Sequence, residues 1–125
     1  MKICLIHDLG EAINGDIPAP QQVGMAPKAD MEERDLKKVL DPLPATLKNE
    51  FLSLWHEYEN VSSEEARLAK ALDKLETIIQ HNQGQNPDDF DYQFNLSYGA
   101  QFTAYAEPIS LLRQIIDADT KAKSA

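Results

Sequence analysis

The sequence predicts an all-α protein, a bundle of roughly four to six helices. Two observations support this fold class. Apolar residues recur at helical spacing in long stretches, which prolines and capping residues separate. Aromatic residues alternate only at Phe90, Tyr92 and Phe94, and that stretch also holds Pro87 and three aspartates, which disfavours a strand.

Length and composition fit a single soluble domain over residues 1–125. The net charge of -9 argues against a nucleic-acid duplex or a membrane as a partner. No apolar stretch reaches membrane-spanning length. The single cysteine, Cys4, excludes an internal disulfide, and its apolar neighbours predict that it is buried. We therefore expect a cytoplasmic protein.

Acidic and imidazole groups are densest near the start of the chain. The apolar residues up to Ile6 end at His7-Asp8, and Glu11 follows His7 by four positions. On a helix, His7 and Glu11 share a face, and Asp8 lies about 100° round from His7. Gly15 and Pro18 then break the helix, so that Asp16 lies on a turn just beyond it.

Two interpretations of this stretch compete. In the first, a helix simply ends in polar residues, with His7 in solvent and Asp16 bonded to its own turn. In the second, the pair His7-Asp8 binds a metal ion, because charge beside a buried apolar segment is costly unless it is paired or bound to a metal. We favour the second interpretation.

The next segments predict two further helices. Prolines make 18–27 a connector. A helix then runs over 28–43 with an apolar face and a solvated charged face, Glu32 to Lys38. Another covers 43–60, with a helically spaced stripe that predicts core or dimer contacts for Trp55 and Tyr58. The two apolar faces are formed by Met31, Leu36, Val39 and Leu40, and by Leu47, Phe51, Leu54, Trp55 and Tyr58.

A long helix over 62–82 begins at a capping box formed by Ser62 and Glu65. Its predicted apolar stripe is Leu68, Leu72, Leu75 and Ile79. Asp73 lies beside that stripe. Two environments are open for it: partly buried under a second helix, or paired at the surface with Lys70 or Lys74.

Residues 84–98 read as a polar, acidic loop. The last helix begins near Glu107 and Pro108, since proline suits the first turn. Its predicted inward-facing residues are Ile109, Leu112, Ile115 and Ile116, followed by a frayed tail over 121–125.

The segment 7–18 resembles the signature of HD-domain metal phosphohydrolases, in the branch that contains the 5'-deoxynucleotidases. The matching residues are His7, Asp8, Glu11, Gly15, Asp16, Ile17 and Pro18. The resemblance implies an HD-domain helical bundle that releases phosphate from (deoxy)nucleoside 5'-monophosphates. It also implies that a small nucleotide is the substrate and that the protein is a hydrolase.

The same resemblance implies roles for individual residues. His7 and Asp8 become metal ligands, and Asp73 matches the last ligand of the family, an aspartate on a late helix. The resemblance implies that Glu11 and Asp16 are the general acid and the general base, and it leaves open which residue has which role. An imidazole with two carboxylates suits Mn, Fe, Co or Zn, with Mg possible.

One departure from the family pattern concerns the first metal-ligand histidine, which precedes the His-Asp pair. Only six residues precede His7 here, and His56 and His81 lie on polar faces. We therefore expect an N-terminally truncated HD bundle, with Met1 an internal methionine of a longer ancestral sequence. We also expect impaired activity and exposed apolar surface that favours a homo-oligomer, a dimer.

Three hypotheses for the function remain open. The chain is a deoxynucleotidase, an HD phosphohydrolase acting on a nucleoside triphosphate or cyclic dinucleotide, or an inactive helical association module. The Gly15–Pro18 motif disfavours the second hypothesis. The missing histidine favours the third.

Overall fold

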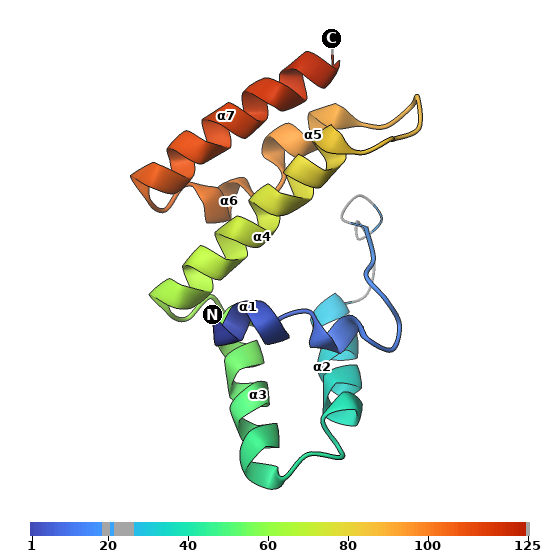
Figure 1. The fold of residues 1–125 in the computed structure, drawn as a ribbon, viewed down its shortest axis with the longest axis vertical. Helices are drawn as coiled ribbons and strands as arrows, with labels where there is room; N and C mark the ends of the chain where they lie inside the picture. The colour runs from blue at the N-terminus through green and yellow to red at the C-terminus, as the bar shows by residue number, and fades with distance from the viewer. Residues whose placement is uncertain (19–20, 22–26, 125) are drawn as a thin grey trace. The chain divides into compact units, whose positions relative to one another are not determined.

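The structure is a computed structural model that describes residues 1–18, 21 and 27–124. Within those residues every regular element is helical, which confirms the predicted all-α class. The elements are α1 (Lys2–Ile6), the 3-10 turn η1 (Leu9–Glu11), α2 (Lys28–Val39), α3 (Ala45–Glu59), α4 (Glu64–Gln83), α5 (Tyr92–Ser97), α6 (Ala100–Thr103) and α7 (Glu107–Ser124). Figure 1 shows them in chain order.

The chain forms two compact units, Met1–Ala66 and Arg67–Ala125. The first contains α1, η1, α2, α3 and the first turn of α4. The second contains the rest of α4 with α5, α6 and α7. Each unit has its own apolar core.

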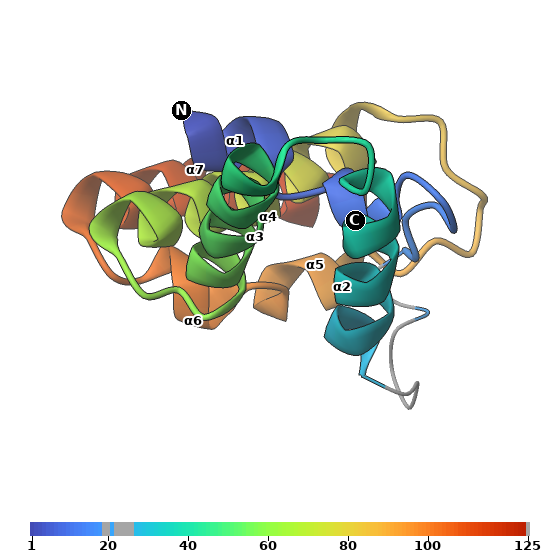
Figure 2. The ribbon, with the colours of Figure 1, turned by 90° about the horizontal axis from the view of Figure 1, so that it is seen from below.

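In the first unit, α2 and α3 lie side by side and are joined by the loop that contains Pro42 and Pro44 (Figure 1). In both Figure 1 and Figure 2, α1 lies against α3. The core of this unit consists of Ile6, Leu36, Leu40 and Trp55. Tyr58 is buried as well, so the predicted core position of both aromatic residues is confirmed, whereas Leu47 is exposed.

The first helix is shorter than predicted. It ends at Ile6, and His7 is its C-cap, so His7 and Glu11 do not share one continuous helix. Gly10 lies in the 3-10 turn that follows, at the point where the chain approaches α2 closely. Cys4 is exposed, so the prediction of a buried thiol is wrong. The predicted connector over 18–27 falls mostly outside the described residues.

The predicted solvated face of α2 is also wrong at two positions. Glu32 and Asp35 are both buried, although charged residues surround them in the sequence. Each has a cationic partner: Lys28 for Glu32 and Lys38 for Asp35. Paired charges can occupy a helix face that composition alone marks as solvent-facing.

In the second unit, Ala71, Leu75, Ile78, Ile109 and Ile116 form the core. Leu68 and Leu72 are exposed, so the buried stripe of α4 is rotated from the predicted one toward its small residues. Small side chains such as Ala69 and Ala71 let neighbouring parts of the chain approach α4 closely, and both are buried.

The ends of α4 and α7 also differ from prediction. The N-cap of α4 is Ser63, whose Oγ accepts a hydrogen bond from the Ala66 backbone N–H at 3.1 Å, whereas Ser62 bonds the Glu57 carbonyl. α7 continues to Ser124, so the tail is not frayed over its described part. Leu112 and Ile115 are exposed, contrary to prediction, while Ile109 and Ile116 are buried as expected.

The predicted acidic loop is helical in its second half. α5 begins after Asp91, whose carboxylate accepts a hydrogen bond from the Phe94 backbone N–H at 3.1 Å. Arg113 of α7 is buried and donates to the backbone carbonyls of Asn95, Leu96 and Tyr98. These bonds hold α5 against α7.

Of the helices in the described part of the chain, none has the length and hydrophobicity needed to cross a bilayer.

Candidate metal centre

The adjacent residues His7 and Asp8 present two ligand atoms to one point. His7 Nδ1 lies 3.0 Å from the carbonyl oxygen of Cys4, one turn earlier in α1. A carbonyl oxygen only accepts hydrogen bonds, so Nδ1 must carry the hydrogen. Nε2 then carries the lone pair of the ring, and it lies 3.2 Å from Asp8 Oδ2. Proteins usually orient a metal-binding imidazole in this way, through a hydrogen bond from the ring nitrogen that does not bind the metal.

The ring of His7 is also held by packing. It lies 4.7 Å from the ring of Tyr58 on α3, centroid to centroid, at an angle of 48°. The side chain of His7 is mostly buried, while that of Asp8 is 63% exposed. The pair therefore combines a fixed imidazole with an accessible carboxylate.

An electron-rich nitrogen and a carboxylate oxygen at this separation require a positive charge between or beside them. A divalent cation can supply that charge when the imidazole is neutral. Nitrogen with carboxylate oxygen suits Mn, Fe, Co or Zn, and Mg less well. The His7-Asp8 pair therefore fits the metal ion that the sequence analysis predicts, and its two ligand atoms would hold one side of that ion.

Asp73, the third predicted ligand, belongs to the second unit, on α4. Its carboxylate is 25% exposed and accepts a hydrogen bond from Lys74 Nζ at 3.0 Å. It is thus partly buried and paired with Lys74, so both environments considered from the sequence apply. Although burial of Lys74 opposes its charge, attraction to Asp73 raises the pKa of Lys74 above its usual value.

Glu11 and Asp16, the predicted acid and base, are both bound to Lys28, a residue that was not among the predicted site residues. Lys28 Nζ lies 2.9 Å from Glu11 Oε1 and 3.3 Å from Asp16 Oδ1. It also lies 3.0 Å from Glu32 Oε1, one turn along α2. One ammonium group thus gathers three carboxylates from three segments of the first unit.

Two close contacts bring these segments together. A Cβ atom at Gly10 would lie 2.8 Å from the Glu32 carbonyl oxygen, so only glycine allows η1 to approach α2 this closely. Asn14 donates a hydrogen bond to the buried carboxylate of Asp35. Gly15 has φ +76°, a conformation that suits glycine, and it turns the chain toward Asp16.

The carboxyl group of Glu11 has a strongly raised pKa. Burial raises it from 4.5 to about 7, and repulsion from Asp8 and Asp16 adds to the effect. The hydrogen bond and attraction from Lys28 oppose the shift without cancelling it. For Lys28, burial opposes the charge, but hydrogen bonds to Glu11 and Glu32 raise its pKa above the usual value. Near neutral pH, Glu11 is therefore a group that can either give or take a proton.

This pKa predicts how stability depends on pH. Because the pKa of Glu11 is higher in the folded chain, the folded state binds this proton more tightly than the unfolded state. The resulting stabilisation is fully present below pH 4.5 and is lost as the pH rises through about 7. Glutamine at this position does not titrate. We expect the difference in free energy of unfolding between the wild type and Glu11→Gln, measured with urea, to fall across that window.

A flat difference between pH 4.5 and 7.5 would contradict the raised pKa of Glu11. Glu33→Gln is the matched control, since Glu33 lies at the surface of α2, and Lys37 together with His56 lowers the pKa of Glu33 rather than raising it.

The other two histidines have partners inside their own units. His56 lies 3.5 Å from Glu33 and its side chain is 46% exposed, as predicted for a surface histidine. His81 Nδ1 lies 3.0 Å from Asn95 Oδ1, and its ring packs on Phe90. Both rings therefore have structural contacts inside their own units.

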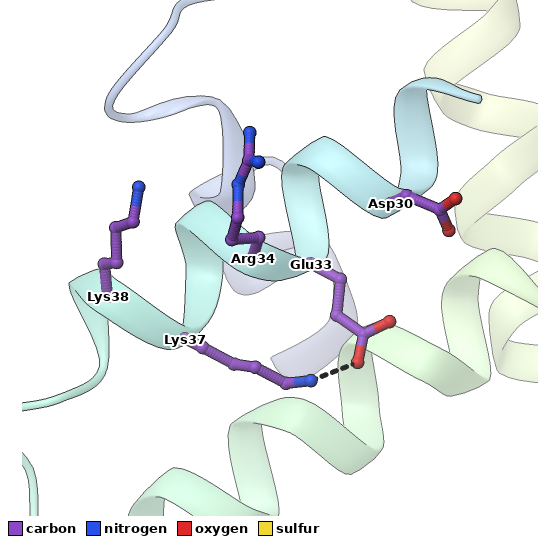
Figure 3. Close-up of a pocket in the computed structure, with 5 residues that line it drawn as sticks. All are labelled: Asp30, Glu33, Arg34, Lys37 and Lys38. Carbon is purple, nitrogen blue, oxygen red and sulfur yellow. Dashed lines mark ion pairs between the residues drawn. The ribbon is translucent and has the colours of Figure 1, made fainter. Parts of the chain in front are cut away.

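A surface pocket of about 300 Å³ lies along α2 (Figure 3). It is lined by Asp30, Glu33, Arg34, Lys37 and Lys38. Figure 3 shows the ion pair between Lys37 and Glu33, in which Nζ and Oε1 are 2.7 Å apart. Of the described residues that line it, none was predicted as a site residue.

Lys28 could have been found from the sequence only in part. It follows Pro27 at the first position of a predicted helix, where a lysine opposes the helix dipole and is therefore unusual. That anomaly suggests a local acidic partner. The identity of the partners depends on the fold, since Glu11 and Asp16 lie on separate segments.

Comparison with known proteins matches most of the chain to one family. The family model of the HD domain matches residues 1–112, which include all the predicted site residues. No solved structure matches the chain.

Several curated relatives share a name. The 5'-deoxynucleotidase HDDC2 of Mus musculus is 40% identical over 80 residues and that of Danio rerio 45%, and each alignment covers 64% of this chain and 40% of the relative. The Homo sapiens protein of the same name is 35% identical over 99 residues, which are 73% of this chain and 48% of that protein. The chain therefore spans less than half the length of these relatives.

Proposed function

This chain belongs to the HD domain family, and from that premise we propose that it is a metal-dependent phosphohydrolase that releases phosphate from deoxynucleoside 5'-monophosphates. The observation that carries the proposal is the His7 Nε2 to Asp8 Oδ2 pair, held at 3.2 Å inside the matched segment. The names of the curated relatives supply the substrate class.

We propose that His7, Asp8 and Asp73 hold the metal ion. The fixed tautomer of His7 and the accessible carboxylate of Asp8 support the first two assignments. The partly buried carboxylate of Asp73 and the extent of the family match support the third. When bound, such an ion supplies positive charge for the phosphate and makes a bound water acidic enough to ionise near neutral pH. Mn, Co, Fe, Zn and Mg are the candidates, and the donor set does not select one.

Glu11 and Asp16 are proposed to move the protons of the reaction. One removes a proton from the attacking water, and the other donates a proton to the leaving oxygen of the nucleoside. Glu11 supports this proposal because its raised pKa leaves both protonation states populated near pH 7. Asp16 is the more accessible of the two, with a side chain that is 66% exposed.

We propose the domain organisation, the oligomeric state and the cellular location on the same basis. The family match runs through both compact units, which supports one HD domain over the whole chain. Exposed apolar residues on α7, including Leu111 and Ile115, support association into a homodimer. A cytoplasmic location agrees with a single, unpaired cysteine.

Release of inorganic phosphate tests the proposal. The chain is incubated with added Mn and a deoxynucleoside monophosphate, a deoxynucleoside triphosphate or a cyclic dinucleotide. We expect the monophosphate to be the preferred substrate. Preference for the triphosphate or the cyclic dinucleotide would replace the proposal by a different HD phosphohydrolase activity.

A further inference from the structure

Lys28 makes more polar contacts than its place at a helix terminus explains. Its ammonium group has three N–H donors, and three carboxylates surround it, those of Glu11, Asp16 and Glu32. The side chain is only 24% exposed. Lys28 thus donates hydrogen bonds to two carboxylates and forms an ion pair with the third, so its charge is directed to these groups rather than to a substrate phosphate.

Glu32 holds the ammonium group of Lys28 from within the same helix. Its side chain is 10% exposed, and it lies one turn after Lys28 on the same helix. The close contact between Gly10 and the Glu32 backbone holds η1 against this turn of α2. Lys28 is therefore fixed from its own helix, independently of Glu11 and Asp16.

Glu11 and Asp16, by contrast, need an external group to stay together. They lie on η1 and on the turn after it, and like charges repel when both are ionised. The turn itself is held by the Asn14 to Asp35 hydrogen bond and by the Gly15 N–H, which donates to the Glu11 carbonyl at 2.7 Å. Neither bond involves the side-chain carboxylate of Glu11 or of Asp16. Lys28 does so for both.

We propose that Lys28 is a positioning residue, which holds the carboxylates of Glu11 and Asp16 at a fixed separation while Glu32 holds Lys28. The inference rests on the proposed function, because it assigns the two carboxylates to proton transfer. Lys28 acts through them and does not touch the substrate. Its loss therefore lowers kcat and leaves KM for the nucleotide unchanged.

The first readout is steady-state phosphate release from a deoxynucleoside monophosphate in excess Mn. We expect Lys28→Met to lower kcat by about 10- to 100-fold at unchanged KM, the range typical for groups that orient a reacting side chain. Lys28→Arg should recover part of kcat, because a guanidinium keeps the charge and several donors. Lys37→Met is the matched control, since Lys37 is 57% exposed and pairs with Glu33.

The second readout needs neither metal nor activity. In ¹⁵N NMR of the metal-free chain, the Lys28 ammonium hydrogens should exchange slowly with water, and their signal should shift in Glu11→Gln and again in Asp16→Asn. Lys37 should show no such signal. A circular dichroism spectrum equal to that of the wild type establishes that each variant is folded.

The outcomes separate the two claims. An unchanged kcat in folded Lys28→Met, with activity in the wild type, overturns the inference and leaves the proposed function in place. An effect on KM alone overturns it too, because it makes Lys28 a substrate contact. Absence of phosphate release from the wild type overturns the proposed function. In that case the NMR readout still tests the contact of Lys28 with both acids. A missing Lys28 ammonium signal, or one that shifts in neither Glu11→Gln nor Asp16→Asn, overturns that contact as well.

Discussion

Glu11→Gln and Asp16→Asn should each lower the rate of phosphate release by about 10²- to 10⁴-fold, the usual contribution of a positioned acid or base. Both substitutions keep the shape of the side chain and remove only its ability to transfer a proton. Glutamine can still accept a hydrogen bond from Lys28, and asparagine tolerates the turn at position 16. The loss should therefore appear in kcat, with the helical content unchanged.

The measurement is initial-rate phosphate release at saturating nucleotide and Mn, with circular dichroism of each variant. Glu33→Gln and Asp30→Asn are matched controls, because both acids lie on α2 and contact neither Glu11 nor Asp16 in any described bond. Wild-type rates in both Glu11→Gln and Asp16→Asn would show that these carboxylates do not carry the chemistry.

His7→Ala and Asp73→Ala should each abolish metal binding. In the proposed site, His7 supplies the only nitrogen ligand and Asp73 supplies one of two carboxylates, so either change leaves too few ligands for a stable site. Isothermal titration with Mn or Co should show binding to the wild type and none to either variant. The prediction for Asp73 is the more informative, because Asp73 belongs to the other compact unit.

His56→Ala is the control for His7, since His56 pairs with Glu33 at the surface. The ring of His7 also packs on Tyr58, so unfolding of His7→Ala must be checked by circular dichroism. Asp8→Asn offers a second test that leaves this packing intact. Tight metal binding that survives both His7→Ala and Asp73→Ala would mean that the ligands are assigned wrongly.

Helix positions were predictable wherever large apolar residues recur at helical spacing between prolines. α2 and α7 begin where the sequence predicts, next to Pro27 and Pro108, whereas α3 begins at Ala45, two residues after its predicted start. The buried faces were less predictable. On α4 the core residue Ala71 is small, while the larger Leu72 beside it is exposed, and size alone favours the wrong residue.

The chemistry near His7 was predictable because its residues are close in sequence. The local pattern indicated His7, Asp8, Glu11 and Asp16, and the structure gives the first two a shared geometry and the last two a shared partner. Lys28 could not be predicted as that partner. Its role depends on the approach of η1 to α2 at Gly10, a tertiary contact that periodicity does not encode.

Phosphate release from a deoxynucleoside monophosphate as a function of added Mn tests the central claim most directly. If this HD domain is a metal-dependent phosphohydrolase, release should be negligible with a chelator, rise with Mn and saturate, since mass action fills the site. It should disappear in His7→Ala at every Mn concentration. Release that is indifferent to the chelator, or no release at any Mn concentration from a chain with intact helices, would contradict the account.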